Sequence, residues 1–297
     1  MVLNLDEAAV AKHLNYGTLI PAMERALAEF SLGKVQQPVR EIIVIEDGKR
    51  YFGIMPAAMA GAMGAKLVSF YPGNEGTAHH THYATITLFD PATGVPLAFM
   101  DGRLITEMRT AAVSAAVTKH AAMPNSKVLA LVGSGVQAQA HLEALRHVGD
   151  FSEVRVWSRN PANAKKFADT NHVKAMELEA AVRGADVVVI ATIAQEPIVK
   201  GAWLKHGVHV NAVGAPRPNW REMDDDVMRN VVIVDSRAAA AKESGDVMMS
   251  RCAVYAEAGE IFAGQKKIDR SATTVFKSLG LAVEDIATAR LVYDAVR

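Results

Sequence analysis

A glycine-rich turn carries the clearest chemical signal in this sequence. The stretch LALVGSGVQAQAHLEALR, residues 129–146, runs from an apolar segment through two glycines into a helical pattern. Glycines there permit a tight turn with close backbone approach, and the free amides at a helix start bind anions. With Ala138 they form G-x-G-x-x-A between a strand and a helix, the fingerprint of dinucleotide binding; an ordinary glycine-rich turn is the alternative. The residues expected around the pyrophosphate are Gly133, Ser134, Gly135, Val136 and Gln137.

The residues after the next apolar segment indicate which dinucleotide is bound. Enzymes that use NAD usually carry Asp or Glu there, about 20 residues past the glycines, to bind the ribose hydroxyls. This chain instead reads Ser158-Arg159-Asn160. A hydroxyl beside a guanidinium suits the 2′-phosphate of NADPH, so these three residues are expected to bind it. Neutral recognition of NADH beside a surface arginine is the alternative.

Three cations stand where a packed fold has little use for them. Alternation along PVREIIVI and along AKLVSF places Arg40 and Lys66 on faces with apolar residues, so both are expected to point inward. Arg109 opens the helical stretch RTAAVSAAV, where the helix dipole disfavours a cation unless an anion offsets it. The three are predicted to form a clamp for a substrate carboxylate between two domains; for each alone, a surface ion pair is the alternative.

The segment AHHTHYATITLF places three histidines within four positions. His79 and His80 precede a strand pattern and are expected in a solvated loop. His82 falls on the face of the apolar residues that alternate after it, where it is either a hydrogen-bonded core histidine or a proton-handling group at a pocket. Histidine clusters also bind metals, but no cysteine or acidic residue joins these at typical ligand spacing, so no metal is predicted.

The second part of the chain, residues 124–280, reads as the Rossmann domain that the fingerprint requires. Short apolar runs alternate with helical stretches, which is typical of a parallel sheet covered by helices. The expected strands are 128–132, 154–157, 187–191, 208–213 and 231–234, with a weak sixth at 173–176. The expected helices are 136–147, 161–170, 177–183 and 238–243.

The first part, residues 1–123, reads as a separate α+β domain for substrate binding and dimerisation. An Asp47-Gly48 turn between two alternating segments is a strong hairpin signal, and two further segments alternate. The expected strands are 39–45, 51–55, 66–70 and 81–89, and an Ala-rich helix is expected from about residue 107 to 122. After Ser271 the pattern is helical with no following strand, so the C-terminal helix, 281–297, is expected to pack back against this domain. The predicted fold class is α/β.

Composition limits the classes of function. The chain has 297 residues, half of them apolar, with 32 basic and 32 acidic residues, so it is expected to bind neither nucleic acid nor membranes. Its one cysteine cannot form an internal disulfide, and its start lacks the pattern of a signal peptide, so a cytoplasmic location is expected. No apolar run approaches the roughly 20 residues that cross a bilayer.

Six stretches spread over both predicted domains resemble the ornithine cyclodeaminase/mu-crystallin family, above all its mu-crystallin branch and its bacterial Δ1-pyrroline-2-carboxylate reductases. They are GAKLVSFYPGN, MDGRLITEMRTAAVSA, LVGSGVQAQAH, NAVGAPRPNWREMDDDVM, VDSRAAAAKESGDV and TTVFKSLGLAVEDI. The resemblance implies a homodimer joined through the sheet of the first domain. It assigns the substrate carboxylate to Arg40, Lys66 and Arg109, and the nicotinamide to Thr192, Val213 and Ser278 to Gly280. His82 matches a histidine of the mu-crystallin branch.

The resemblance implies reduction of a cyclic imine carboxylate by NADPH. The substrate would be Δ1-pyrroline-2-carboxylate or Δ1-piperideine-2-carboxylate, and the product proline or pipecolate. Because a protonated iminium is electrophilic without a dedicated acid, the site must mainly orient substrate and exclude water; Lys66 or His82 would keep the nitrogen protonated. Ornithine cyclodeaminase, alanine dehydrogenase and an NADPH-dependent binder of a thyroid-hormone-like ligand are the alternatives.

One departure from the family pattern argues against deamination. Cyclodeaminases and the related alanine dehydrogenase have Gly-x-Asp where this chain has Gly214-Ala215-Pro216. The aspartate that handles the substrate amino group or the attacking water is therefore missing. The acidic run at 224–226 is better suited to capping a helix than to replacing it.

Overall fold

The computed structural model describes residues 2–297, which divide into two compact units. The first unit comprises the chain up to Arg109 together with Gly280–Arg297, and the second unit comprises Thr110–Leu279. The division falls inside a single helix, α3 (Arg103–Ala121), whereas the expected boundary near residue 123 lies just after it. In the part of the chain that the structure describes, no helix has both the length and the apolar character that crossing a bilayer requires.

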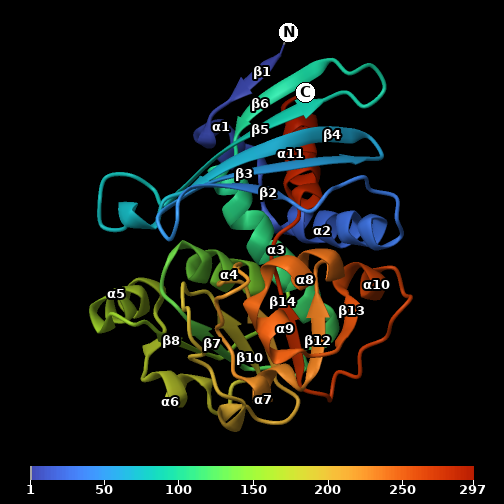
Figure 1. Ribbon diagram of the computed structural model, residues 1–297. Coiled ribbons are helices and arrows are strands. Elements are labelled where there is room, and N and C mark those ends of the chain that lie inside the picture. Colours follow the sequence, from blue (N-terminus) through green and yellow to red (C-terminus); the bar gives the residue numbers. More distant parts are fainter. Residues whose placement is uncertain (1) are drawn as a thin grey trace. The chain divides into compact units, whose positions relative to one another are not determined.

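The first unit is built on a six-stranded sheet with the order β1-β6-β5-β4-β3-β2 (Figure 1). Its strands are β1 (Leu3–Leu5), β2 (Glu41–Glu46), β3 (Arg50–Met59), β4 (Ala62–Phe70), β5 (His82–Phe89) and β6 (Pro96–Asp101). Strands β2 to β6 form an antiparallel meander, and β1 pairs with β6 in parallel. The predicted hairpin is confirmed: Gly48 has a φ of 74° in the turn between β2 and β3, a conformation that favours glycine.

Helices cover one face of this sheet. They are α1 (Glu7–His13), α2 (Tyr16–Ser31), the first part of α3, and α11 (Ala282–Val296). Helix α11 lies against β3, β4 and β5 and also against α2 (Figure 1). Because successive side chains of a strand point to opposite faces, alternation buries Met55, Ile86 and Met100 on the helix side.

The opposite face of the same sheet is apolar but exposed. Leu67, Tyr83 and Phe99 are 41%, 43% and 46% exposed, and the strand register places all three on this face. Ile43 on the edge strand β2 extends the patch, with 51% of its surface exposed. We call these four residues the outer sheet face. A contiguous exposed apolar surface of this kind is typical of a protein–protein interface.

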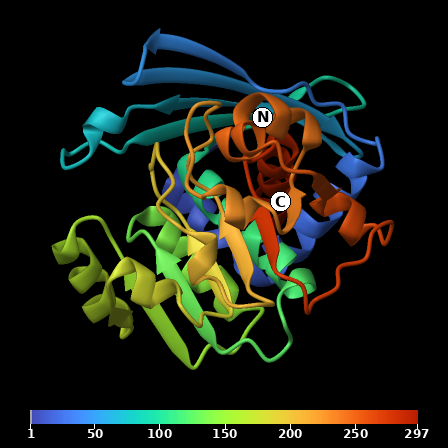
Figure 2. The ribbon, with the colours of Figure 1, turned by 60° about the horizontal axis from the view of Figure 1, so that its bottom comes forward.

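The second unit is built on an eight-stranded parallel sheet (Figure 2). Its strands are β7 (Val128–Val132), β8 (Glu153–Trp157), β9 (Lys174–Ala175), β10 (Val187–Ile190), β11 (His209–Ala212), β12 (Val231–Val234), β13 (Val254–Glu257) and β14 (Thr274–Lys277). The order β13-β12-β14-β11-β10-β7-β8-β9 contains the Rossmann arrangement. In that arrangement all strands are parallel, and the order in which the chain adds them to the sheet reverses between β7 and β10. The predicted α/β fold class is therefore confirmed.

The helices of the second unit connect these strands. They are α4 (Val136–Arg146), α5 (Pro161–Asn171), α6 (Leu178–Val182), α7 (Asp225–Met228), α8 (Arg237–Glu243), α9 (Gly245–Ser250) and α10 (Ala258–Phe262). Side-chain caps start several of them: Asn160 caps α5, Asp224 caps α7 and Ser236 caps α8, each by accepting a backbone N–H of the first turn.

Sequence analysis missed four strands, β1, β6, β13 and β14, and the last of them corrects an expectation. The stretch after Ser271 was expected to be helical throughout, but Thr274–Lys277 forms β14, fully buried between β11 and β12. The helix starts only at Ala282. A short apolar run that is buried on both faces has no alternation, so its period does not distinguish a central strand from a buried helix.

A network of polar side chains lies in the core of the second unit. His209 contacts Thr274 Oγ1 at 2.8 Å and Asn211 Oδ1 at 3.2 Å, and Asn211 donates to Thr118 Oγ1. His141 contacts Ser114 Oγ at 2.9 Å and the carbonyl of residue 137 at 2.7 Å. Burial lowers the pKa of both histidines to about 4, so both are neutral at pH 7.

Candidate active site

Lys66 is the buried cation that sequence alternation predicted. It lies in the middle of β4 on the helix side of the sheet and is 1% exposed. Its ammonium is 2.6 Å from Asp285 Oδ2 and donates to Thr106 Oγ1 at 3.3 Å. A buried ammonium without partners would be very unfavourable, so the first turn of α11 supplies the carboxylate that keeps it in place.

Arg109 joins the same cluster, but not for the reason expected from the sequence. Helix α3 begins at Arg103, so Arg109 lies in the second turn and the helix dipole at its first turn does not explain it. The guanidinium is 4% exposed and donates to Glu284 Oε2 at 2.6 Å and to Asp285 Oδ1 at 3.0 Å. The anions that offset its charge are therefore these two protein carboxylates.

Gly280 lets the guanidinium come close to the backbone. It has a φ of 79°, and a Cβ built on it would lie 2.3 Å from Arg109 Nη1. Any side chain at this position would displace Arg109 as well as strain the backbone. The resemblance assigned Gly280 to the nicotinamide; the structure places it in the first unit, against the predicted substrate clamp.

A third cation, Arg40, lies near this cluster. Arg40 precedes β2 and is half-buried; Val44, which alternation places on the same face, lies opposite the buried Tyr51 but is 54% exposed because β2 is an edge strand. Burial lowers the pKa of Lys66 to about 8; Asp285 opposes this shift, whereas Arg109 and Arg40 add to it. Lys66 and Arg109 are thus paired with Glu284 and Asp285, and Arg40 is a third cation close to Lys66.

His82 is not a core histidine. It begins β5, is exposed and stacks on Phe70 with ring centroids 4.4 Å apart. The apolar residues that alternate after it are buried as expected. His82 itself is exposed because it is the first residue of the strand. Its role as a proton donor stays a prediction. Among residues 2–297, no group of three or more His, Cys, Asp or Glu side chains is arranged to hold a metal ion.

The fingerprint of the second unit has the geometry that a dinucleotide requires. Gly133 has a φ of 121°, and its Cβ would lie 2.4 Å from the carbonyl oxygen of Ala191, so only glycine fits. Gly135 begins α4 as its N-cap and has no neighbouring atom within 4 Å of a built Cβ, which leaves room for a phosphate at the helix start. Val136, in the first turn, is 55% exposed, unusual for valine and consistent with covering a ligand.

The predicted nicotinamide residues of this unit lie at one edge of the sheet. Thr192 follows β10, Val213 follows β11 and Ser278 follows β14. The strands are parallel, so their carboxyl ends share that edge, where open α/β sheets bind ligands. Ser278 Oγ is buried and has no hydrogen-bond partner among the described residues, and Ile193 in the loop after β10 is 47% exposed. Both features fit a bound cofactor, and sequence analysis missed Ile193.

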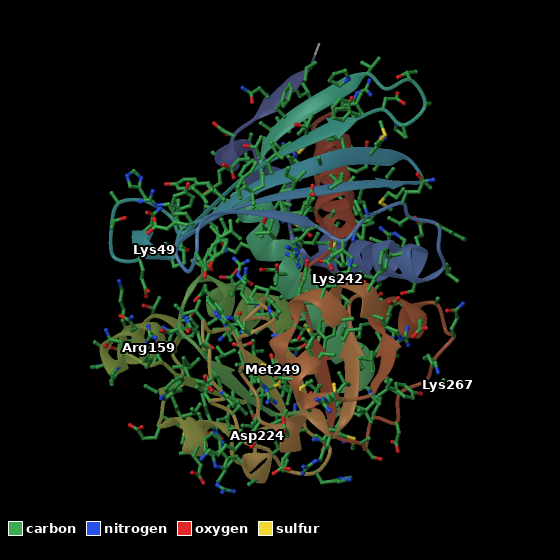
Figure 3. The ribbon with its side chains drawn as sticks, viewed as in Figure 1. Lys49, Arg159, Asp224, Lys242, Met249 and Lys267 are labelled. Carbon is green, nitrogen blue, oxygen red and sulfur yellow. The ribbon has the colours of Figure 1, made fainter. Side chains whose placement is uncertain are left out.

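The residues predicted to select NADPH lie after β8. Ser158 is half-buried, and Arg159 is exposed at the start of α5 (Figure 3). Asn160 accepts a hydrogen bond from the backbone N–H of Ala162 and caps α5, so its side-chain oxygen already has a structural role. Arg159 is therefore the charged group available at this strand end for a 2′-phosphate.

The acidic run near Pro216 does not replace the missing aspartate. Pro216 is exposed, and Asp224 caps α7 by accepting the N–H of Val227 at 3.0 Å. Asp225 pairs with Arg221 at 2.6 Å, and Asp226 pairs with Arg229. The prediction that this run starts a helix is confirmed.

Sequence analysis also missed the carboxylates that hold the cations. Glu284 and Asp285 are fully buried in the first turn of α11, where acidic residues are common because they favour the helix dipole. Their only signal was their place in the otherwise apolar run LGLAVEDIA. Three further charged residues of the second unit are fully buried in one cluster that sequence analysis did not single out: Lys277, Glu222 and Asp246.

Comparisons with known proteins match the whole chain. The Ketimine reductase mu-crystallin of Mus musculus is 49% identical over 301 residues, which cover 98% of this chain and 96% of the mouse protein. The structure of Thermococcus litoralis Δ1-pyrroline-2-carboxylate reductase in complex with NADH and L-proline is similar, with a TM-score of 0.94 and 36% identity over 99% of this chain and 97% of that one. An archaeal alanine dehydrogenase dimer with bound NAD has a TM-score of 0.93 and 33% identity over 99% and 96% of the two chains.

A family model extends the agreement over both units. The model described as "Ornithine cyclodeaminase/mu-crystallin family" matches residues 2–297. The family predicted from the six sequence stretches is therefore confirmed. This chain belongs to the ornithine cyclodeaminase/mu-crystallin family.

Proposed function

We propose that this protein is an NADPH-dependent ketimine reductase that converts Δ1-pyrroline-2-carboxylate or Δ1-piperideine-2-carboxylate to proline or pipecolate. The observation that carries the proposal is the buried cluster of the first unit, in which Asp285 holds Lys66 and Arg109 side by side, with Arg40 close to Lys66. Cations fixed in this way suit a substrate with a carboxylate. The names of the relatives support reduction of a C=N bond.

The cluster would bind and orient the substrate. Lys66 and Arg109 are held by Asp285, so their charges stand at fixed positions and need no rearrangement when a carboxylate arrives. Two of the guanidinium donors of Arg109 already bind protein carboxylates, so the substrate would be held by its remaining donors together with Lys66 and Arg40. Fixing the carboxylate fixes the adjacent imine carbon, which is the atom to be reduced.

A proton must stay on the imine nitrogen until the carbon is reduced. Because burial lowers the pKa of Lys66 only to about 8, its ammonium is mainly protonated at neutral pH and can donate a hydrogen bond to that nitrogen. His82 is the alternative donor. When bound, NADPH supplies the hydride; the carbon gains it, the nitrogen keeps its proton, and the product is a cyclic secondary amine.

The second unit would hold the cofactor. The amides at the start of α4 would bind the pyrophosphate beside Gly135, and Arg159 with Ser158 would bind the 2′-phosphate. The relatives of known structure named above contain NADH or NAD, which supports a nicotinamide cofactor in this unit. The preference for NADPH rests on Ser158 and Arg159.

A panel of substrates tests this function. Loss of NADPH absorbance with both cyclic imine carboxylates is the expected result, with negligible formation of proline from ornithine and NAD. Deamination needs a base for the substrate amine, and Pro216 stands where the family has an aspartate. Ammonia release from ornithine at about 1 per second or faster would overturn the proposal, as would oxidation of alanine in preference to imine reduction. Cofactor binding without turnover of any imine would indicate a ligand-binding protein instead.

The outer sheet face supports a second proposal, that the protein is a homodimer joined through the first unit. Leu67, Tyr83 and Phe99 lie on one face of a central part of the sheet, and a second copy would bury them. The archaeal alanine dehydrogenase is described as a dimer. Light scattering on the purified protein should give twice the chain mass, and the double variant Leu67→Glu, Phe99→Glu should give a monomer. A wild-type monomer at about micromolar concentration would contradict the proposal.

A further inference from the structure

Three charged side chains form a buried cluster in the second unit. Lys277 ends β14, Asp246 lies in α9 and Glu222 lies in the segment before α7; all three are fully buried. Lys277 Nζ is 3.0 Å from Asp246 Oδ2 and 3.5 Å from Glu222 Oε2. It also donates to the carbonyl oxygen of Gly214 at 2.5 Å. The contact between Lys277 and Asp246 places α9 beside the end of β14 (Figure 1).

The cluster has one carboxylate more than its cation can balance. Asp246 Oδ1 accepts the backbone N–H groups of Glu222 and Met223, so these dipoles favour its ionised form. Burial alone would lower the pKa of Lys277, but Asp246 and Glu222 together raise it, so the ammonium is retained. With Glu222 ionised, these three side chains therefore carry one net negative charge. Because water and salt screen buried charges only weakly, this charge acts on groups around the cluster.

Glu222 contacts one of the residues predicted to line the nicotinamide, Thr192. Its Oε1 accepts the hydroxyl of Thr192 at 2.8 Å and the N–H of Thr192 at 3.2 Å. A Cβ built on Gly214, which follows the predicted nicotinamide residue Val213, would lie 2.4 Å from the same oxygen. The carboxylate is thus one side chain away from the edge where the cofactor would bind.

We propose that Glu222, held between Lys277 and Thr192, sets the relative affinity of this protein for the oxidised and the reduced cofactor. The oxidised nicotinamide ring carries a positive charge that the reduced ring lacks, so the ionised carboxylate attracts the oxidised form selectively. Protonation of Glu222 removes the net charge and with it this selectivity. Thr192 holds Glu222 in place, and Glu222 acts on the cofactor by its charge, as a positioning residue. The inference rests on the proposed binding of a nicotinamide cofactor.

The charge of Glu222 can change within the ordinary working range of pH. Burial raises its pKa to about 7; Asp246 adds to this rise and Lys277 opposes it. The groups that act on its pKa are Lys277 from β14, Asp246 from α9 and the uncharged Thr192 from the loop after β10, while the neighbouring Arg221 pairs with Asp225. Cys252, which is close to Asp246, has its pKa raised by burial and stays uncharged. Binding of the oxidised cofactor is therefore coupled to loss of a proton from Glu222.

The ratio of two dissociation constants tests this coupling. NADPH and NADP⁺ are titrated calorimetrically into the whole protein at several pH values from about 5.5 to about 8.5, around the pKa of Glu222. The affinity for NADP⁺ relative to NADPH should rise about tenfold over this range. Because both forms carry the same phosphates, titration of the phosphates cancels in the ratio.

Two variants separate the charge of Glu222 from its hydrogen bonds. Glu222→Gln keeps an acceptor for Thr192 but has no charge, so its ratio should stay at the low-pH value of the wild type throughout. Asp246→Asn keeps the acceptor for the two backbone N–H groups and leaves a neutral pair, so its ratio should also lose its dependence on pH. Glu179→Gln, at an exposed position of α6, is the matched control and should behave as the wild type.

The outcomes distinguish this inference from the proposed function. A wild-type ratio that is independent of pH would overturn the inference while cofactor binding stands, whether or not the variants fold. Equal weakening of both cofactor forms in Glu222→Gln, with the wild-type pH dependence retained, would overturn it too and assign the residue a structural role only. If the wild type bound neither form, the proposed function itself would fail.

Discussion

Each unit of this protein encloses a buried charge cluster, and the two clusters differ in composition. In the first unit, Lys66 and Arg109 are paired with the two carboxylates of α11, and Arg40 lies close to Lys66. In the second unit, two carboxylates outnumber Lys277. Burying ions is costly unless they are paired, so both clusters hold their cations against carboxylates. The first cluster offers fixed cations to the proposed substrate carboxylate, and the second offers a carboxylate in excess of its cation to the proposed cofactor.

The two clusters also differ in how the chain supplies them. One short segment, residues 277–285, contributes Lys277 to the second unit and Glu284 and Asp285 to the first. In the first unit this segment brings the anions, and in the second it brings the cation. Substitution of Lys277 and substitution of Asp285 therefore remove partners from different clusters.

The largest effect is expected from breaking the first cluster at Arg109. Arg109→Lys keeps the charge but lacks the planar group that binds a carboxylate at two points and that contacts Glu284 and Asp285 here. Turnover of the cyclic imine should fall about hundredfold or more, because the imine carbon is no longer fixed. Arg103→Lys, on the same helix but paired with Glu7, is the control and should lose little. Unchanged kinetics in Arg109→Lys would leave the residue a structural role only.

A smaller effect is expected from the fingerprint of the second unit. Gly135→Ala places its Cβ in open space, so the protein should fold while affinity for NADPH falls about thirtyfold by crowding of the pyrophosphate. Gly133→Ala should instead lower the melting temperature, because its Cβ meets the carbonyl of Ala191 and its φ is positive. Calorimetric titration and thermal unfolding distinguish the two. Wild-type affinity in Gly135→Ala would argue against a pyrophosphate at this turn.

The third prediction concerns the choice of cofactor. Arg159→Ala should lower kcat/KM with NADPH about tenfold and leave that with NADH nearly unchanged, since only NADPH has the 2′-phosphate. Lys165→Ala removes another exposed cation of the same region and is the control. Equal losses with both cofactors would assign Arg159 a general electrostatic role.

The smallest effect is a change in pH dependence at Lys66. Because burial lowers its pKa to about 8, kcat/KM should fall as pH rises through 8, and at pH 8.5 it should be about fourfold below its plateau. Lys66→Arg has a lower plateau but stays charged, so its decline should shift well above this range. A decline at the same pH in both proteins would belong to a different group.

Residues that belong to a local sequence pattern could be predicted from the sequence. Contacts between residues that are distant in the sequence could not. The fingerprint at Gly133 and Gly135 and the turn at Gly48 were predictable, because the backbone itself demands glycine there. Lys66 was found by period two, since a lysine that alternates with apolar residues in a strand points inward. The family was recognisable from six separate stretches.

The partners of these residues were not predictable, because they come from distant parts of the chain. Asp285 is more than two hundred positions from Lys66, and a pair of acids at a helix start looks ordinary. Strand β14 was missed because four buried residues have no alternation, and with it Lys277 was missed. His82 shows the opposite failure: its pattern was right, but the strand starts at this residue and leaves it exposed.

The polar network in the core of the second unit has a consequence for how the protein tolerates acid. Unfolded histidine binds a proton near pH 6.5, whereas His141 and His209 in the folded core bind one only near pH 4. As pH falls through this interval the unfolded chain takes up more protons, so each histidine lowers the free energy of unfolding by up to about 3 kcal/mol. Glu222 acts in the opposite direction between about pH 7 and 4.5, because its folded form holds the proton more tightly. Two histidines outweigh one carboxyl group, so mild acid destabilises the Rossmann core itself.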